Sequence, residues 1–131
     1  MCLFCKIING EVESKKIYED DKSVAFLDVS PVSAGHTLVI PKKHIANLEE
    51  ISAEDLSAFI QSVKKVGKLL KDKLQVPAYN IVLNNGKQAG QEIFHLHFHL
   101  IPRVEHDNLQ CFKSRSYEAG EMEEVYNKLT S

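Results

Sequence analysis

Short apolar runs recur over residues 15–40, and polar turn segments separate them. Short apolar or β-branched runs bounded by turn residues are typical of strands, so the pattern predicts three strands. These strands are residues 15–19, 23–29 and 36–40. Their short connections favour an antiparallel meander, in which Pro31 and Pro41 end the second and third strands. Residues 3–8 are amphipathic, and we expect them to form a short N-terminal helix.

Between Ser52 and Lys73 the apolar residues recur every three or four positions, which is the period of an amphipathic helix. Ser52 is suited to cap the start, with Asp55 at the third helical position. Lysines gather in the last turns, where the helix dipole favours positive charge, and Pro77 prevents continuation. We therefore expect one long helix, followed by a fourth strand at residues 79–83.

The stretch from residue 94 to residue 101 places three histidines at alternate positions in an apolar run. Successive side chains of a strand point to opposite faces, so the histidines share one face and the apolar residues share the other. The two sets are His95, His97 and His99 against Phe94, Leu96, Phe98 and Leu100. We predict a fifth strand here. The expected fold class is α+β, a five-stranded antiparallel sheet with one long helix and a short N-terminal helix.

The length and composition fit a single domain over residues 1–131. At 131 residues with 44% hydrophobic residues, the chain can bury a core without disulfides. Residues 104–131 form a C-terminal tail that lacks the earlier pattern, although residues 117–129 predict a short acidic helix.

The net charge of -2 argues against nucleic acid or a membrane surface as a partner, because such partners usually require a broad positive patch. No run reaches the roughly 18 apolar residues that span a bilayer, and the start does not resemble a signal peptide. We therefore expect a cytoplasmic protein. Three cysteines in a reducing compartment argue against a disulfide framework and leave metal binding or free thiols.

The histidine face admits three interpretations. It is a solvent-facing strand, a metal site with only Glu92 and Glu105 as nearby carboxylates, or a site of covalent catalysis on phosphorus, in which an imidazole attacks. The polar loop at residues 84–91 favours the third. Its glycines permit unusual backbone conformations, so its amides and the side chains of Asn84 and Gln91 can face an oxyanion.

The run from His95 to Ile101 is similar to the signature of the histidine triad (HIT) nucleotide hydrolases and transferases. The chain resembles the Hint-type branch of that family from Cys2 to Arg103, in particular its small prokaryotic members. The other matching stretches are residues 4–11, 18–21, 26–31, 35–44 and 90–91. The resemblance implies a homodimer whose sheets join, with a HIT-like fold in each subunit.

The resemblance also implies that a purine nucleotide conjugate is cleaved through a nucleotidyl-histidine intermediate, with no metal required for the attack. His97 matches the nucleophile and His99 the phosphate contact, while His95 and His36 match residues that orient the imidazoles. The positions that match nucleotide-binding residues are Leu3, Phe4, Ile7, Phe26, Asp28, Val29, Leu38, Asn84, Gly90, Gln91, Glu92 and Ile93. Among these, Asp28 matches the carboxylate that binds the ribose hydroxyls.

The leading expectation is a hydrolase that releases a nucleoside monophosphate from phosphoramidates or related conjugates. A dinucleoside polyphosphate hydrolase, a nucleotidyl transferase and a non-catalytic nucleotide-binding module are the alternatives.

The chain departs from the branch at Glu92, where a serine that assists the leaving group is common. Either burial raises the pKa of Glu92 and lets its carboxyl act as a general acid, or Glu92 is a solvated surface charge. The tail after residue 103 also departs, and the chain contains no tryptophan.

Cys2 and Cys5 have the spacing of half a zinc site. His44 and His95 complete the set if the N-terminal element packs beside the histidine strand, and the four then resemble a structural zinc site of some prokaryotic family members. The alternative is a pair of reduced thiols near the terminus. Cys111 has no partner in the sequence.

Overall fold

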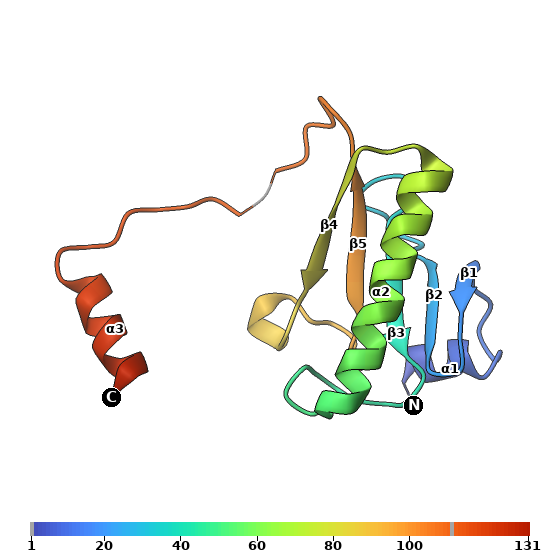
Figure 1. Cartoon of the computed structure of the whole chain (residues 1–131), viewed down its shortest axis with the longest axis horizontal. Coiled ribbons are helices and arrows are strands. Elements are labelled where there is room, and N and C mark those ends of the chain that lie inside the picture. The colour runs from blue at the N-terminus through green and yellow to red at the C-terminus, as the bar shows by residue number, and fades with distance from the viewer. Residues whose placement is uncertain (1, 111) are drawn as a thin grey trace.

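The computed structural model describes residues 2–110 and 112–131, so Cys111 lies outside the described residues (Figure 1). Five antiparallel strands form one sheet in the order β1-β2-β3-β5-β4. The strands are β1 (Lys16–Glu19), β2 (Ser23–Leu27), β3 (Thr37–Pro41), β4 (Ala78–Leu83) and β5 (Phe98–Arg103). The helices are α1 (Leu3–Ile8), α2 (Ala53–Leu74) and α3 (Glu121–Thr130), with a short 3-10 turn, η1 (Lys87–Ala89). The predicted α+β class is confirmed.

Both faces of the sheet are covered, α2 packing on one and α1 on the other (Figure 1). Two of the three interior strands, β2 and β3, therefore carry apolar residues on both faces. In β3, Val39 belongs to the core under α2, while Leu38 and Ile40 belong to the core under α1. Alternation along each strand thus divides the apolar residues between two cores rather than between core and solvent.

The long helix begins as its capping signal predicts. The backbone N–H of Asp55 donates to the Ser52 hydroxyl at 3.1 Å, which satisfies one of the free amides of the first turn. The helix ends at Leu74, where Gln75 adopts the left-handed conformation with φ 54°. Within the described residues, no helix combines the length and the apolar character that crossing a membrane requires.

The fifth strand is shorter at its start than predicted. It begins at Phe98, and Phe94 is 49% exposed rather than part of the core. Pro41 has no N–H to donate, and its carbonyl accepts a hydrogen bond from the His95 ring at 2.7 Å. The backbone N–H of Leu96 donates instead to the Ile45 carbonyl at 2.6 Å. Residues 94–97 are therefore held by side-chain and loop contacts rather than by the sheet.

The second strand also ends earlier than predicted. It stops at Leu27, and Val29 is 95% exposed. The Asp28 carboxylate accepts a hydrogen bond from the backbone N–H of Ser30 at 2.8 Å, a local turn that bends the chain out of the sheet before Pro31.

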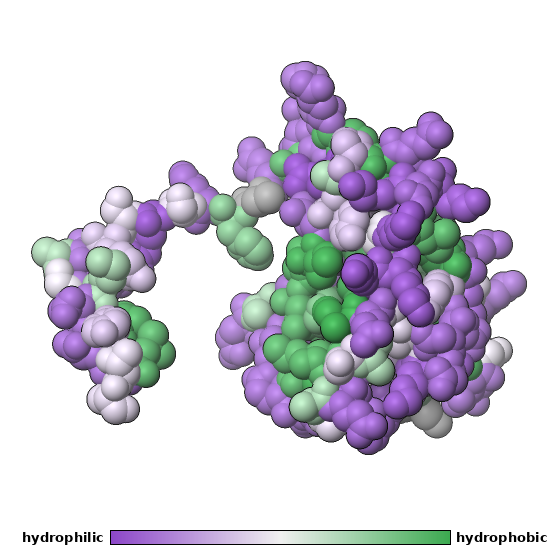
Figure 2. All heavy atoms as spheres, in the orientation of Figure 1, coloured by the Kyte–Doolittle hydropathy of each residue, from purple (hydrophilic) through white to green (hydrophobic). Residues whose placement is uncertain are grey.

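The C-terminal segment leaves the sheet after Arg103 and carries α3 away from the rest of the chain (Figure 1). The predicted acidic helix is present but starts at Glu121, after Gly120 with φ 80°. Its apolar residues are exposed: Met122, Val125, Tyr126 and Leu129. Figure 2 shows apolar surface both on this helix and on the body, where Figure 1 places β4 and α2.

Gly67 tests how tightly α2 approaches the sheet. A Cβ atom at this position would overlap the Tyr79 ring of β4. We expect Gly67→Ala to destabilise the fold by about 1–3 kcal/mol, although alanine normally favours a helix over glycine by about 1 kcal/mol. Urea denaturation measures the change, with Gln61→Ala on the exposed face of α2 as control. A Gly67→Ala protein as stable as wild type would contradict this packing.

Candidate active site and metal cluster

A cavity of about 630 Å³ opens on the α1 side of the sheet, a size typical of small-molecule sites. Its walls come from α1, the end of β2, the start of β3 and the loop around η1, and His36, His97 and His99 line it. The structure brings all predicted nucleotide-binding residues except Gln91 to this lining. They are Leu3, Phe4, Ile7, Phe26, Asp28, Val29, Leu38, Asn84, Gly90, Glu92 and Ile93.

Gln91 holds the loop rather than facing the cavity. It is 3% exposed, and its side-chain amide donates to the carbonyls of Ala46 at 2.7 Å and Ile93 at 3.1 Å. Its side-chain oxygen accepts from the backbone N–H of Gly86 at 2.9 Å. These bonds engage the whole amide group, so the side chain has no spare donor for a ligand.

Sequence reasoning missed part of the cavity wall. The additional lining residues are Val12, Glu13, Ser14, Leu27 and Ser30. Leu27 and Ser30 lie in the matching stretch 26–31 but were not predicted to bind nucleotide. The other three belong to no motif, and only the return of the chain from α1 to β1 brings them to the cavity. Glu92, by contrast, was singled out, and it lies exposed at the cavity edge. The burial that would make its carboxyl a general acid is therefore missing in the single chain.

His97 has the hydrogen bond of a neutral nucleophile. Its Nδ1–H donates to the backbone carbonyl of His95 at 2.8 Å, which leaves the lone pair of Nε2 free. The ring is 7% exposed and meets the Phe4 ring edge to face, with centroids 5.0 Å apart. Burial lowers the pKa of His97, so the imidazole stays unprotonated at neutral pH.

A hydrogen-bond chain fixes the proton of His99. The backbone N–H of Val32 donates to Nδ1 of His36 at 3.0 Å, so the proton of neutral His36 is on Nε2. That Nε2 lies 2.9 Å from Nδ1 of His99 and donates to it. The proton of His99 is therefore on Nε2, which is buried and has no partner among the described residues. His99 thus carries an unpaired N–H donor in the lining of the cavity.

Burial and two neighbouring imidazoles lower the pKa of His99 to about 4. The neighbours are His97 and His36, and the pKa of His36 is also lowered by burial. Asp28, with its carboxylate 3.6 Å from Nε2 of His36, raises the pKa of that ring, but burial lowers it more. All three rings are therefore neutral at pH 7, and the tautomers above hold at that pH.

A second cluster lies behind the first, where Cys2, Cys5, His44 and His95 bring their ligand atoms within 4.8 Å of one another. The Cys2 sulfur is 3.5 Å from Nδ1 of His95, and the Cys5 sulfur is 3.3 Å from Nδ1 of His44. Tetrahedral zinc with two sulfur and two nitrogen ligands separates neighbouring ligand atoms by about 3.3–3.8 Å. The four residues are therefore close enough to hold a metal ion.

The chemistry of this donor set also fits a metal. His95 donates its Nε2–H to the Pro41 carbonyl, which turns the lone pair of Nδ1 toward the two sulfurs. Burial and the neighbouring Cys2 raise the pKa of the Cys5 thiol. Binding of a metal ion would displace the thiol proton and relieve that penalty. A further grouping, Asp28 with His36 and His99, fits less well because the His36–His99 hydrogen bond already uses their facing nitrogens.

The loop before the histidines turns at two glycines. Gly86 and Gly90 have φ angles of 104° and 98°, which strongly favour glycine. Gly90 and Asn84 both reach the cavity lining. The loop therefore presents backbone and amide donors on the same side as His97 and His99.

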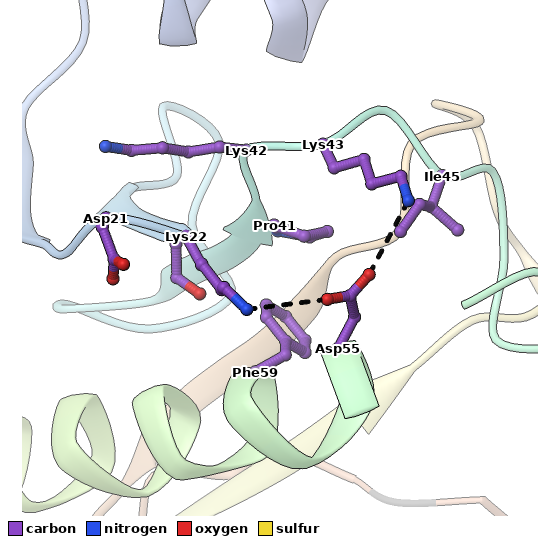
Figure 3. A pocket seen from close by; sticks show the side chains of 9 residues that line it. Asp21, Lys22, Pro41, Lys42, Lys43, Ile45, Asp55 and Phe59 are labelled. Carbon is purple, nitrogen blue, oxygen red and sulfur yellow. Dashed lines mark ion pairs between the residues drawn. The ribbon is translucent and has the colours of Figure 1, made fainter. Parts of the chain in front are cut away.

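A smaller cavity of about 190 Å³ lies on the α2 side of the sheet, where Figure 3 shows its side chains. Lys22 and Lys43 each form an ion pair with Asp55, at 3.8 Å and 3.7 Å (Figure 3). Pro41 and Phe59 provide its apolar wall. None of the predicted site residues lines this cavity.

Comparisons with known proteins agree with the histidine motif. The sequence model of the HIT domain matches residues 9–106. A HIT-like protein of Methanocaldococcus jannaschii is 55% identical over 107 residues, which cover 82% of each chain. An adenosine 5'-monophosphoramidase of Candida albicans is 46% identical over 106 residues, which cover 78% of this chain and 70% of the relative.

The fold agrees as well. A crystal structure of a HIT-family protein from Bacillus subtilis superposes with a TM-score of 0.87 and 38% sequence identity. The match covers 98% of this chain and 94% of the other.

The lowered pKa values predict how stability depends on pH. The unfolded chain protonates its histidines near pH 6.5, whereas folded His99 stays neutral down to about pH 4. The unfolded state therefore binds more protons in this window, and the free energy of unfolding falls as pH drops from 6.5 to about 4. We expect His99→Gln to flatten this slope in urea denaturation series.

His106→Gln is the matched control for that series, because it removes a histidine whose side chain is 88% exposed and lies outside the cavity. A His99→Gln protein with the same slope as wild type would show that His99 does not carry the effect.

Proposed function

The chain belongs to the HIT-domain family, and we propose that it hydrolyses purine nucleotide conjugates, such as nucleoside phosphoramidates, to the nucleoside monophosphate. The observation that carries this proposal is the free Nε2 of His97 beside the Nε2–H of His99 in one cavity. Nε2 of His97 offers a lone pair to attack phosphorus, and Nε2–H of His99 offers a proton to hydrogen-bond a phosphoryl oxygen. Attack on a phosphoryl group requires both. The similarity to a monophosphoramidase supports the substrate class.

In the first step, Nε2 of His97 attacks the α-phosphorus and the phosphorus–nitrogen bond breaks. The leaving nitrogen takes up a proton and departs as an amine. The imidazole becomes positively charged as the new bond forms, and the His95 carbonyl, 2.8 Å from Nδ1, stabilises that charge. Nε2–H of His99 and the amides of the loop around Gly90 stabilise the phosphoryl oxygens.

In the second step, water attacks the phosphorus and His97 leaves as a neutral imidazole. The water releases one proton, which balances the proton that the amine took up. Neither step passes through a metal ion. The nucleoside part binds along the rest of the cavity, with Asp28 at the ribose and the apolar side chains of α1, Phe26 and Leu38 around the base.

The test of this function is release of AMP from adenosine 5'-phosphoramidate. We expect turnover by wild type and a loss of about 10³-fold or more in His97→Ala and His97→Asn, because no other histidine of the described residues presents a free lone pair to this cavity. His106→Gln, an exposed histidine, is the matched control. Undiminished turnover in the His97 variants would overturn the nucleophile. Tight AMP binding with no turnover on any conjugate would favour a non-catalytic nucleotide-binding module.

We also propose that the cysteine–histidine cluster binds a structural zinc ion. Cys2, Cys5, His44 and His95 would fill all four positions of a tetrahedron, so no position stays open for substrate. When bound, zinc would supply a rigid link between α1 and His95 rather than Lewis-acid chemistry. Fixing the His95 ring also fixes the carbonyl that holds His97.

Metal analysis tests this site separately from activity. We expect about one zinc ion per chain in wild type and a strong loss in Cys5→Ser, whereas Cys111→Ser should keep its metal. Thermal unfolding should show a lower midpoint for Cys5→Ser, because metal binding stabilises the fold. A wild-type protein that contains no metal and is fully active would remove the proposal.

We further propose a homodimer in which two sheets join. The edge strands are β1 and β4, and β1 is short, charged and irregular in its pairing. β4 has six residues and carries Ile81, which is 50% exposed. An exposed edge with apolar residues favours pairing with another strand. The exposed apolar residues of α3 likewise require a partner surface, which a second subunit would provide.

A further inference from the structure

Among the side chains that the structure describes, three buried polar atoms have no hydrogen-bond partner: Ser14 Oγ, Ser23 Oγ and His99 Nε2. Folded proteins satisfy nearly all such atoms, so each exception requires an explanation. Ser14 and His99 line the large cavity, and Ser23 lines the small one. The proposed reaction uses His99 but gives Ser14 no role.

The register between β1 and β2, continued beyond both strands, brings Ser14 level with Asp28. Lys16 pairs with Phe26, and the backbone N–H of Leu27 donates to the Lys15 carbonyl at 3.1 Å, beyond the start of β1. Two residues past the Lys16–Phe26 pair, the same register sets Ser14 opposite Asp28. The pleat turns both side chains to the face of Phe26, because paired residues and alternate residues share a face. All three residues line the same cavity.

Ser14 therefore belongs to a part of the cavity wall that combines polar and apolar residues. The polar residue is Asp28, whose carboxylate lies 3.6 Å from Nε2 of His36. The apolar residues are Ile7, Val12 and Phe26, which pack together. A ligand with a hydroxylated sugar at Asp28 and a ring against the apolar residues would bring the junction of sugar and ring to Ser14.

We propose that the Ser14 hydroxyl recognises the sugar edge of the bound base by donating a hydrogen bond to N3 of a purine. This inference rests on the proposed function, in which Asp28 binds the ribose. N3 is an acceptor on the side of adenine and guanine that faces the ribose, and guanine adds the N2 amine as a donor there. A serine hydroxyl has one proton to donate and two lone pairs to accept with, so it can bind the sugar edge of either purine.

Binding of AMP and of 3-deaza-AMP, in which a C–H group replaces N3, tests the contact in the full chain. By calorimetry, we expect Ser14→Ala to weaken AMP binding about 3- to 10-fold, the usual effect of losing one neutral hydrogen bond. The same substitution should leave 3-deaza-AMP binding unchanged, because that ligand has no N3 acceptor to lose. Ser14→Thr keeps the hydroxyl and should bind AMP within about twofold of wild type.

Ser23→Ala is the matched control, since it removes the other buried serine hydroxyl without touching the large cavity. It should bind both ligands as wild type does. An equal loss on AMP and 3-deaza-AMP in Ser14→Ala would overturn the base contact. A loss that disappears with 2'-deoxy-AMP, but not with 3-deaza-AMP, would assign the hydroxyl to the ribose and overturn it as well.

The same titrations separate this inference from the function on which it rests. If wild type binds and hydrolyses adenosine conjugates and Ser14→Ala binds AMP equally well, only the role of Ser14 is overturned. Wild type that binds no nucleotide overturns the proposed function and the role of Ser14 together.

Discussion

The placement of the His95 ring is the constraint on which the rest of the site depends. The ring is fully buried, and each of its polar groups has a separate partner. Nε2 donates to the Pro41 carbonyl, Nδ1 faces the two cysteine sulfurs, and the backbone carbonyl holds Nδ1 of His97. A shift of this one residue would disturb the end of β3, the cysteine–histidine cluster and the orientation of His97 together.

The pKa values in the cavity follow from burial and not from a strong ion pair. His36, His97 and His99 are all held neutral, because burial lowers the pKa of each ring more than the Asp28 carboxylate raises it. Neutrality gives each ring one donor and one acceptor, so a chain of hydrogen bonds has a single consistent direction. The backbone N–H of Val32 sets that direction, and the final donor of the chain is His99 Nε2.

The sequence was sufficient for the elements whose patterns are local. The period of α2, its Ser52 cap and the alternation of Leu96, Phe98 and Leu100 are all found as predicted. It was insufficient where tertiary contacts replaced local ones. The start of β5 depends on the bond between His95 and Pro41, which are 54 residues apart, and the burial of Gln91 depends on Ala46.

The candidate site divides in the same way. Family resemblance named His97, His99 and the Cys–His cluster because their spacing is itself a signature. Ser14 has no such signature. Its position follows from the register between β1 and β2, and register is set by pairing over the whole hairpin. A hydroxyl in that place becomes notable only when its burial and its missing partner are known.

The small size of α1 has a consequence for how the protein is made. A helix of six residues is too short to persist in water by itself, so α1 depends on its contacts with the rest of the chain. Phe4 rests on the His97 ring, and Cys2 reaches His95, which is 93 positions later. The α1 segment therefore gains its packing contacts only when residues 95–97, which lead into β5, the last strand in chain order, are also in place. A truncated product that ends before residue 95 would contain every residue of the base pocket wall on α1 and β2, yet it would have no formed pocket.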